Sequence, residues 1–124
     1  MDNFWYYFMG EVFHEVIFYK KYFLGFVDEQ SIKVAKKIFW TIDLIRHARF
    51  VPEPYMKSIE GVDGLSEIRV IFGGDIFRIF CFFDDGKLII LANGFQKKTQ
   101  KTPQREIDRA LRIKDEYYAE KGKH

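Results

Sequence analysis

Cysteine is nearly absent from this chain of 124 residues, and histidine is rare. The single cysteine, Cys81, cannot form an internal disulfide, and its place in an apolar run is typical of a core residue. The three histidines are scattered and match no metal-site spacing, and no glycine-rich nucleotide loop or nucleophile elbow occurs. We therefore expect no metal and no cofactor, and a cytoplasmic location is the ordinary expectation for such a chain.

Long apolar runs are missing too, since none approaches the roughly 20 residues that a membrane-spanning helix needs. Hydrophobic residues nevertheless make up 48% of the chain and aromatic residues 19%, which is enough apolar surface for a folded core. The length suits one domain over residues 1–124. We expect residues 1–9 to be a poorly ordered extension or a product of start-site choice between Met1 and Met9, and residues 120–124 to fray.

Charge of one sign does not dominate the whole chain, because the formal net charge is only +2. The distribution is uneven, however. Between residues 86 and 114 the acidic residues are Glu106 and Asp108, whereas the basic residues are Lys87, Lys97, Lys98, Lys101, Arg105, Arg109, Arg112 and Lys114. A basic C-terminal third favours a polyanionic partner, although a solvated surface with a lysine-rich helix end gives the same pattern.

Alternation, helical periodicity and turn residues predict the order strand, long helix, three strands, helix. Asp28 is the expected N-cap of the long helix, and Thr102 and Pro103 are the expected N-cap and first residue of the last helix. The predicted ranges are 12–19 (strand), 20–26 (helical turn), 29–47 (helix), 65–72, 75–83 and 87–95 (strands) and 103–119 (helix).

This order predicts an α+β domain. Its small, mostly antiparallel sheet combines the N-terminal strand with a three-stranded meander. One face of the sheet is expected to pack on the long helix, and the other face is partly exposed or covered by the C-terminal helix.

Two arginines are expected on one face of the meander. With Gly73-Gly74 as a two-residue turn, Arg69 lies directly opposite Arg78, and a four-residue turn also keeps both on one face, whereas a three-residue turn separates them. Like charges directly opposite each other destabilise a sheet by about 0.2–1 kcal/mol, so the pair indicates a binding role. The structural alternative is that Glu67 bridges the two arginines.

A lysine arrives on the same face from the third meander strand. If Asp85-Gly86 forms a two-residue turn, Asn93 and Lys97 share the face of Arg78, whereas a three-residue turn with a bulge brings Lys98 there instead. The sequence leaves both alternatives open.

Such a group of cations suits a phosphate, because arginine binds phosphate oxygens bidentately and lysine adds a point charge. Lys57, in a loop opened by Pro52 and Pro54, is a further candidate. The aromatic residues Phe80 and Phe95 can stack on bases if exposed, although core packing is the commoner role of such residues.

Three stretches carry a resemblance to a known family: GLSEIR at 64–69, FRIFCFF at 77–83 and LANGFQKKTQKTP at 91–103. They resemble the HigB-like, phage-derived branch of the RelE/ParE toxin superfamily, over roughly residues 10–120. The run GFQKKTQKTP is the part most specific for that branch. The chain departs from it at Ser66, where these toxins often have tyrosine, and at Asn93, where they often have histidine.

The resemblance implies a RelE-like fold and the toxin role of a type II toxin–antitoxin system. Such toxins act as metal-independent endoribonucleases that cut mRNA on the ribosome and stop translation. Their usual partner is a helix-turn-helix antitoxin, here HigA-like, and a heterotetramer with it is one expected assembly. The expected site comprises the catalytic residues Arg69, Arg78, Lys97 and Lys57 and the RNA-binding residues Lys98, Lys101, Asn93 and Phe95.

The expected reaction uses the 2′-hydroxyl of the RNA as its nucleophile. The protein then has to orient the RNA, stabilise a phosphorane and move protons, and a lysine whose pKa is lowered by cationic neighbours is the expected proton acceptor. Two alternatives stay open. One is a non-catalytic, ParE-like gyrase inhibitor, and the other is an inactive toxin-fold binding module.

Overall fold

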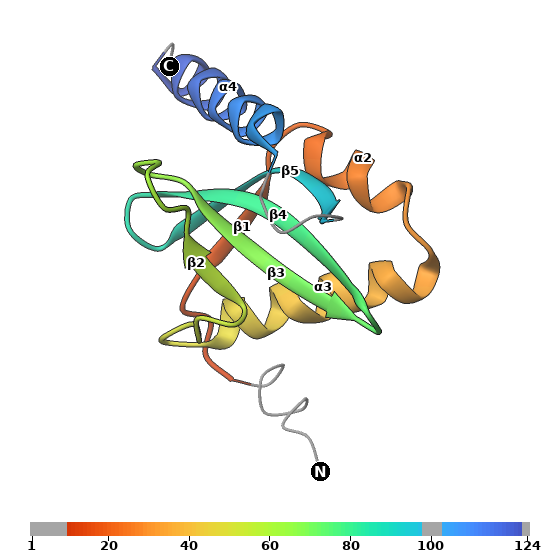
Figure 1. The fold of residues 1–124 in the computed structure, drawn as a ribbon. Coiled ribbons are helices and arrows are strands. Elements are labelled where there is room, and N and C mark those ends of the chain that lie inside the picture. Colours follow the sequence, from red (N-terminus) through yellow and green to blue (C-terminus); the bar gives the residue numbers. More distant parts are fainter. Residues whose placement is uncertain (1–9, 98–102, 123–124) are drawn as a thin grey trace.

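The computed structural model describes residues 10–97 and 103–122 (Figure 1). Five strands and three helices follow one another along the chain: β1 (Glu15–Phe18), α2 (Tyr22–Asp28), α3 (Ile32–His47), β2 (Met56–Ser58), β3 (Ser66–Phe72), β4 (Asp75–Asp84), β5 (Leu88–Lys97) and α4 (Gln104–Lys121). Within the described ranges, none of the helices has the length and apolar character that crossing a bilayer requires.

The strands form one mixed sheet in the order β1-β5-β4-β3-β2. The N-terminal strand β1 runs parallel to β5, and the other three pairings are antiparallel. The predicted α+β class, the meander β3-β4-β5 and the RelE-like arrangement are therefore confirmed. Strand β2 was not predicted, because Pro52 and Pro54 indicated a loop and three residues are too few to show an alternating pattern.

Helices cover both faces of this sheet. Ile68, Val70 and Ile79 point to the face that packs on α3 and α2, together with Ile38 and Phe23 of those helices. Because neighbouring strand residues point to opposite faces, Leu65 and Phe80 lie on the other side, where they pack against Ile107, Ala110 and Ile113 of α4. The candidate site lies on this second face, beside α4.

The start of α3 differs from the prediction. Ser31 is the N-cap, and its hydroxyl oxygen accepts a hydrogen bond from the backbone N–H of Val34 at 3.2 Å. Asp28 is instead the last residue of α2, whose C-terminal turn is closed by bonds from the N–H groups of Glu29 and Gln30. The prediction of Asp28 as the cap was wrong, because the short helix before it uses Asp28 within its own last turn.

Helix α4 is longer than predicted and begins one residue later. Pro103 occupies the N-cap position rather than the first helical turn, and Thr102 lies outside the described residues. The helix continues to Lys121, so the prediction that fraying begins at residue 120 was wrong. Lys121 donates to Asp84 of β4 at 2.7 Å, and Glu120 pairs with Lys20 at 2.6 Å, so tertiary contacts hold this last turn.

Candidate nucleic-acid site

The two arginines lie side by side on the face that α4 shares. Phe72 pairs with Asp75, so Gly73-Gly74 is a two-residue turn, and Arg69 is the register partner of Arg78. The predicted placement of both arginines on one face is confirmed. In most sheets this close pairing of like charges is unfavourable, so a neighbouring group has to compensate for it.

Glu67 provides that compensation for Arg78. The Arg78 guanidinium donates through Nη1 to Oε1 of Glu67, and the two side chains are only 4% and 2% exposed. Burial lowers the pKa of Arg78 and the charge of Glu67 opposes this shift, and an arginine so placed still carries its proton. The expected bridging by Glu67 is thus realised for Arg78, whereas Arg69 forms no ion pair within the described residues.

The position of Lys97 depends on two irregularities in the β4–β5 hairpin. Asp84 pairs with Leu88, so three residues form the connection, which was the arrangement predicted to select Lys98. Between Ile79 and Cys81 the register then shifts again by one residue, because Phe80 of β4 lies opposite both Ala92 and Asn93 of β5. As a result Arg78 pairs with Phe95, and Lys97 returns to the face of Arg78 and lines the same pocket.

Lys97 has an altered proton affinity in this position. Burial lowers its pKa below the ordinary 10.5, and the positive charge of Arg78 lowers it further, as do Arg69 and Lys57 to a smaller extent. Glu67 acts in the opposite direction. The predicted fall in a lysine pKa is therefore present at Lys97, although burial contributes more than any one of the cationic neighbours does.

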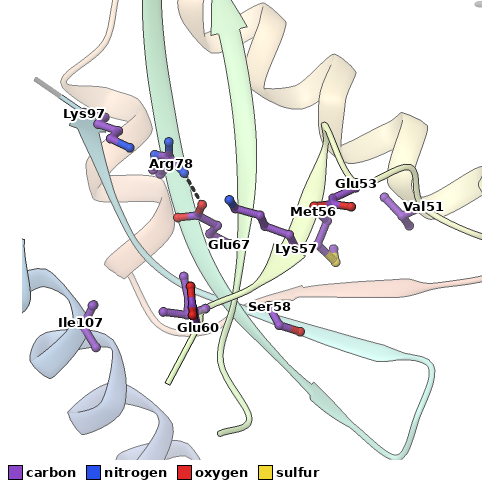
Figure 2. Close-up of a pocket in the computed structure, with 11 residues that line it drawn as sticks. Val51, Glu53, Met56, Lys57, Ser58, Glu60, Glu67, Arg78, Lys97 and Ile107 are labelled. Carbon is purple, nitrogen blue, oxygen red and sulfur yellow. Dashed lines mark hydrogen bonds and ion pairs between the residues drawn. The ribbon is translucent and has the colours of Figure 1, made fainter. Parts of the chain in front are cut away.

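Lys57 reaches the site from β2 rather than from a loop. It is the register partner of Glu67, and its side chain is exposed. Figure 2 shows Lys57 on one side of the Glu67–Arg78 pair and Lys97 on the other. Four cations from four different strands, Lys57, Arg69, Arg78 and Lys97, therefore gather on one face of the sheet.

An open pocket of about 980 Å³ is lined by three of these four cations (Figure 2). Its lining includes Lys57, Arg78 and Lys97, and also three carboxylates, Glu53, Glu60 and Glu67. The described lining therefore has mixed charge, and of its three carboxylates the sequence analysis considered only Glu67. Glu53 and Glu60 were missed because they belong to the connections around β2, which had been predicted as a loop.

Two of the residues expected to bind RNA are held by other contacts. Asn93 is 1% exposed and donates to the backbone oxygen and the carboxylate of Glu106 in α4, each at 3.2 Å. Its prediction as an RNA-binding residue was wrong, because α4 covers it. Phe95 is half-buried and stacks on the fully buried Phe80, with ring centroids 5.4 Å apart, so one face of its ring is already occupied.

The remaining candidates cannot be placed in the same way. Lys98 and Lys101 lie outside the described residues. Among residues 10–97 and 103–122, no group of three histidine, cysteine or carboxylate side chains is arranged to hold a metal ion.

The family of the chain follows from a match that includes this site. The model for the family described as Phage derived protein Gp49-like (DUF891) matches residues 25–115. The chain belongs to the Gp49-like family. This family is known in the context of toxin–antitoxin systems, so the predicted resemblance is confirmed at that level. A comparison with curated proteins found no match.

All four strand-borne cations of this Gp49-like protein lie inside the matched range. The range also contains Glu67 and most of α4. The burial of Glu67 was missed from the sequence because strand alternation places it on the face of Arg69 without showing how much of that face is covered.

Proposed function

We propose that this Gp49-like protein is the toxin of a type II toxin–antitoxin system, of the HigB-like branch, and that it cleaves mRNA on the ribosome. The observation that supports this proposal best is that Lys57, Arg78 and Lys97 line one open pocket, with Arg69 on the same sheet face as the register partner of Arg78. Cations held on rigid strands are suited to a phosphodiester whose negative charge increases in the transition state. Family membership supports the toxin role.

The proposed reaction uses the RNA, the protein and water. The RNA 2′-hydroxyl loses its proton and attacks the neighbouring phosphorus, a 2′,3′-cyclic phosphate forms, and the bond to the 5′-oxygen breaks. Lys97 is the proposed proton acceptor, since its lowered pKa increases the fraction that is neutral. The departing 5′-oxygen takes a proton from water. Arg69 and Lys57 bind the phosphate oxygens, while the buried Arg78 contributes positive charge from the sheet.

The partners follow from the same proposal. A helix-turn-helix, HigA-like antitoxin binds the chain, and a heterotetramer is the assembly we expect. The cytoplasm, where ribosomes and mRNA are found, is the proposed location. The chain acts there as one toxin domain.

Induced expression with mapping of mRNA 5′ ends tests this function. We expect new ends inside translated codons, and a loss of cleavage of at least about a hundredfold in Arg69→Gln and Lys97→Met. Lys87→Met is the matched control, because Lys87 is an exposed lysine of the β4–β5 connection that does not line this pocket. Growth arrest with DNA breaks and intact mRNA would favour the gyrase inhibitor, and harmless expression would favour the binding module.

A further inference from the structure

Glu67 is the most deeply buried charged side chain of the site. It lies on β3 between its register partners Lys57 on β2 and Phe80 on β4, and only 2% of its side chain is exposed. Oε1 accepts the hydrogen bond from Arg78, whereas Oε2 has no partner within the described residues. A buried carboxylate with one unused oxygen is costly, which calls for an explanation beyond packing.

The two arginines beside Glu67 also have hydrogen-bond donors without partners among the described residues. The Nε–H groups of Arg69 and Arg78 are both buried and have no acceptor among the described residues. Glu67 and Arg78 line a pocket that is open to solvent, and Arg69 is the register partner of Arg78. The four cations still outnumber the three carboxylates Glu53, Glu60 and Glu67 by one charge, so an anion is attracted to this site.

We propose that Glu67 is a positioning residue that holds the Arg78 guanidinium beneath the phosphate site and weakens ground-state binding of the RNA phosphodiester. This inference rests on the proposed function and adds to it the role of Glu67 in orienting Arg78 and in setting the strength of RNA binding. The carboxylate occupies Arg78 before the substrate arrives, so Arg78 is kept in one orientation. Its charge also repels a bound phosphate.

This arrangement favours the transition state over the bound substrate. The phosphate carries one negative charge in the bound RNA and a second as the phosphorane forms, so the attraction to a fixed Arg78 increases along the reaction. A guanidinium that is already oriented does not have to reorganise at that moment. Removal of the carboxylate charge is therefore expected to strengthen binding and to slow the chemical step.

The test uses the Glu67→Gln variant of the full chain, which keeps the shape of the side chain and removes its charge. Binding is measured on programmed ribosomes whose mRNA carries a 2′-O-methyl group at the decoding codon, since this RNA lacks the nucleophile. Cleavage is measured on the unmodified mRNA at saturating protein. We expect Kd to fall about 3- to 10-fold and the cleavage rate constant to fall about tenfold or more, on the scale of one charge at a few ångströms.

Glu15→Gln is the matched control, because Glu15 is an exposed carboxylate of the edge strand β1 and lies away from this pocket. It is expected to change neither quantity. The double variant Glu67→Gln/Arg78→Gln guards against a trivial loss of folding, since it removes both charges of the buried pair. In the Arg78→Gln background, Glu67→Gln should no longer slow cleavage, because there is no guanidinium left to position.

Three outcomes overturn the inference. The first is an unchanged or higher Kd in Glu67→Gln, and the second is a cleavage rate of Glu67→Gln equal to that of the unsubstituted chain. The third is that Glu67→Gln slows cleavage equally in the presence of Arg78 and in the Arg78→Gln background. If the unsubstituted chain cleaves mRNA while any of these is found, only the role of Glu67 fails. If the unsubstituted chain neither binds nor cleaves on ribosomes, the proposed function itself fails.

Discussion

Arg69 and Arg78 are direct register partners on β3 and β4, yet among the residues that the structure describes only Arg78 is held by a carboxylate, that of Glu67. The two arginines therefore differ in what they do for the fold. Arg78 neutralises a buried charge, whereas Arg69 adds a like charge next to it.

Substitution of the two arginines by methionine should have opposite effects on stability. Arg78→Met leaves Glu67 buried without a partner, so the free energy of unfolding should fall by about 3–5 kcal/mol. Arg69→Met removes a like-charge contact and should change that free energy by less than about 1 kcal/mol, in the stabilising direction. Urea denaturation of the two variants measures both values, and equal losses would contradict the structural difference between them.

Lys97 should give cleavage a distinctive pH dependence. Its pKa is lowered by burial and then by Arg78, so the neutral form that can accept a proton increases as pH rises toward the lowered pKa. We expect the single-turnover rate to rise with pH and then to level off below pH 10.5. Lys97→Arg keeps the positive charge but should lose this rise, because an arginine does not deprotonate in this range.

The same shift predicts a change in stability with pH. The folded chain binds fewer protons at Lys97 than the unfolded chain does between the lowered pKa and 10.5, so this site makes stability increase as pH rises through that window. Below the lowered pKa, the cost of burying the charge is present in full. The difference in unfolding free energy between Lys97→Met and the unsubstituted chain, followed from pH 7 to 10.5, should shrink as pH rises.

Asp84 should make the docking of α4 sensitive to acid. Its carboxylate accepts hydrogen bonds from Lys121 and Tyr117, each at 2.7 Å, and these bonds lower its pKa below 3.8. The stabilisation is therefore present above pH 3.8 and is lost as pH falls through the lowered pKa of the folded chain. Asp84→Asn should lower the thermal midpoint at pH 7, with a smaller difference at pH 2. Asp85→Asn is the control, because Asp85 is 84% exposed and should change the midpoint little.

A side chain at Gly94 should destabilise the fold. A Cβ at this position of β5 would lie 2.5 Å from the ring of Phe26, which is itself buried in the core between α2 and the sheet. Gly94→Ala should therefore lower the free energy of unfolding by about 1–3 kcal/mol. Gly74→Ala is the matched control, since its Cβ would meet nothing within 4 Å, and chemical denaturation should show it close to the unsubstituted chain.

Local patterns were sufficient for much of this protein. Alternating apolar residues predicted β3 and β4, the paired glycines predicted the two-residue turn, and together they placed Arg69 opposite Arg78. These features depend on neighbouring residues and on the geometry of a tight turn, which the sequence contains directly. The two helices on either side of the meander were predicted for the same reason, although α2 was expected only as a turn.

The composition of the site depended on contacts between distant segments. The bulge in β5 opposite Phe80 restored Lys97 to the face of Arg78, and the pairing of β2 with β3 brought Lys57 beside Glu67. Burial by α4 made Asn93 a partner of Glu106. None of these follows from a local pattern, because each results from packing two segments that are far apart in the chain.

The sequence by itself therefore indicated that Arg69 and Arg78 share a sheet face, because the two-residue period of a strand and the Gly73-Gly74 turn place them opposite each other. Only the tertiary structure decided which of them are open to solvent and which are neutralised, because burial and the reach of Glu67 to Arg78 depend on the helices and strands that close around them.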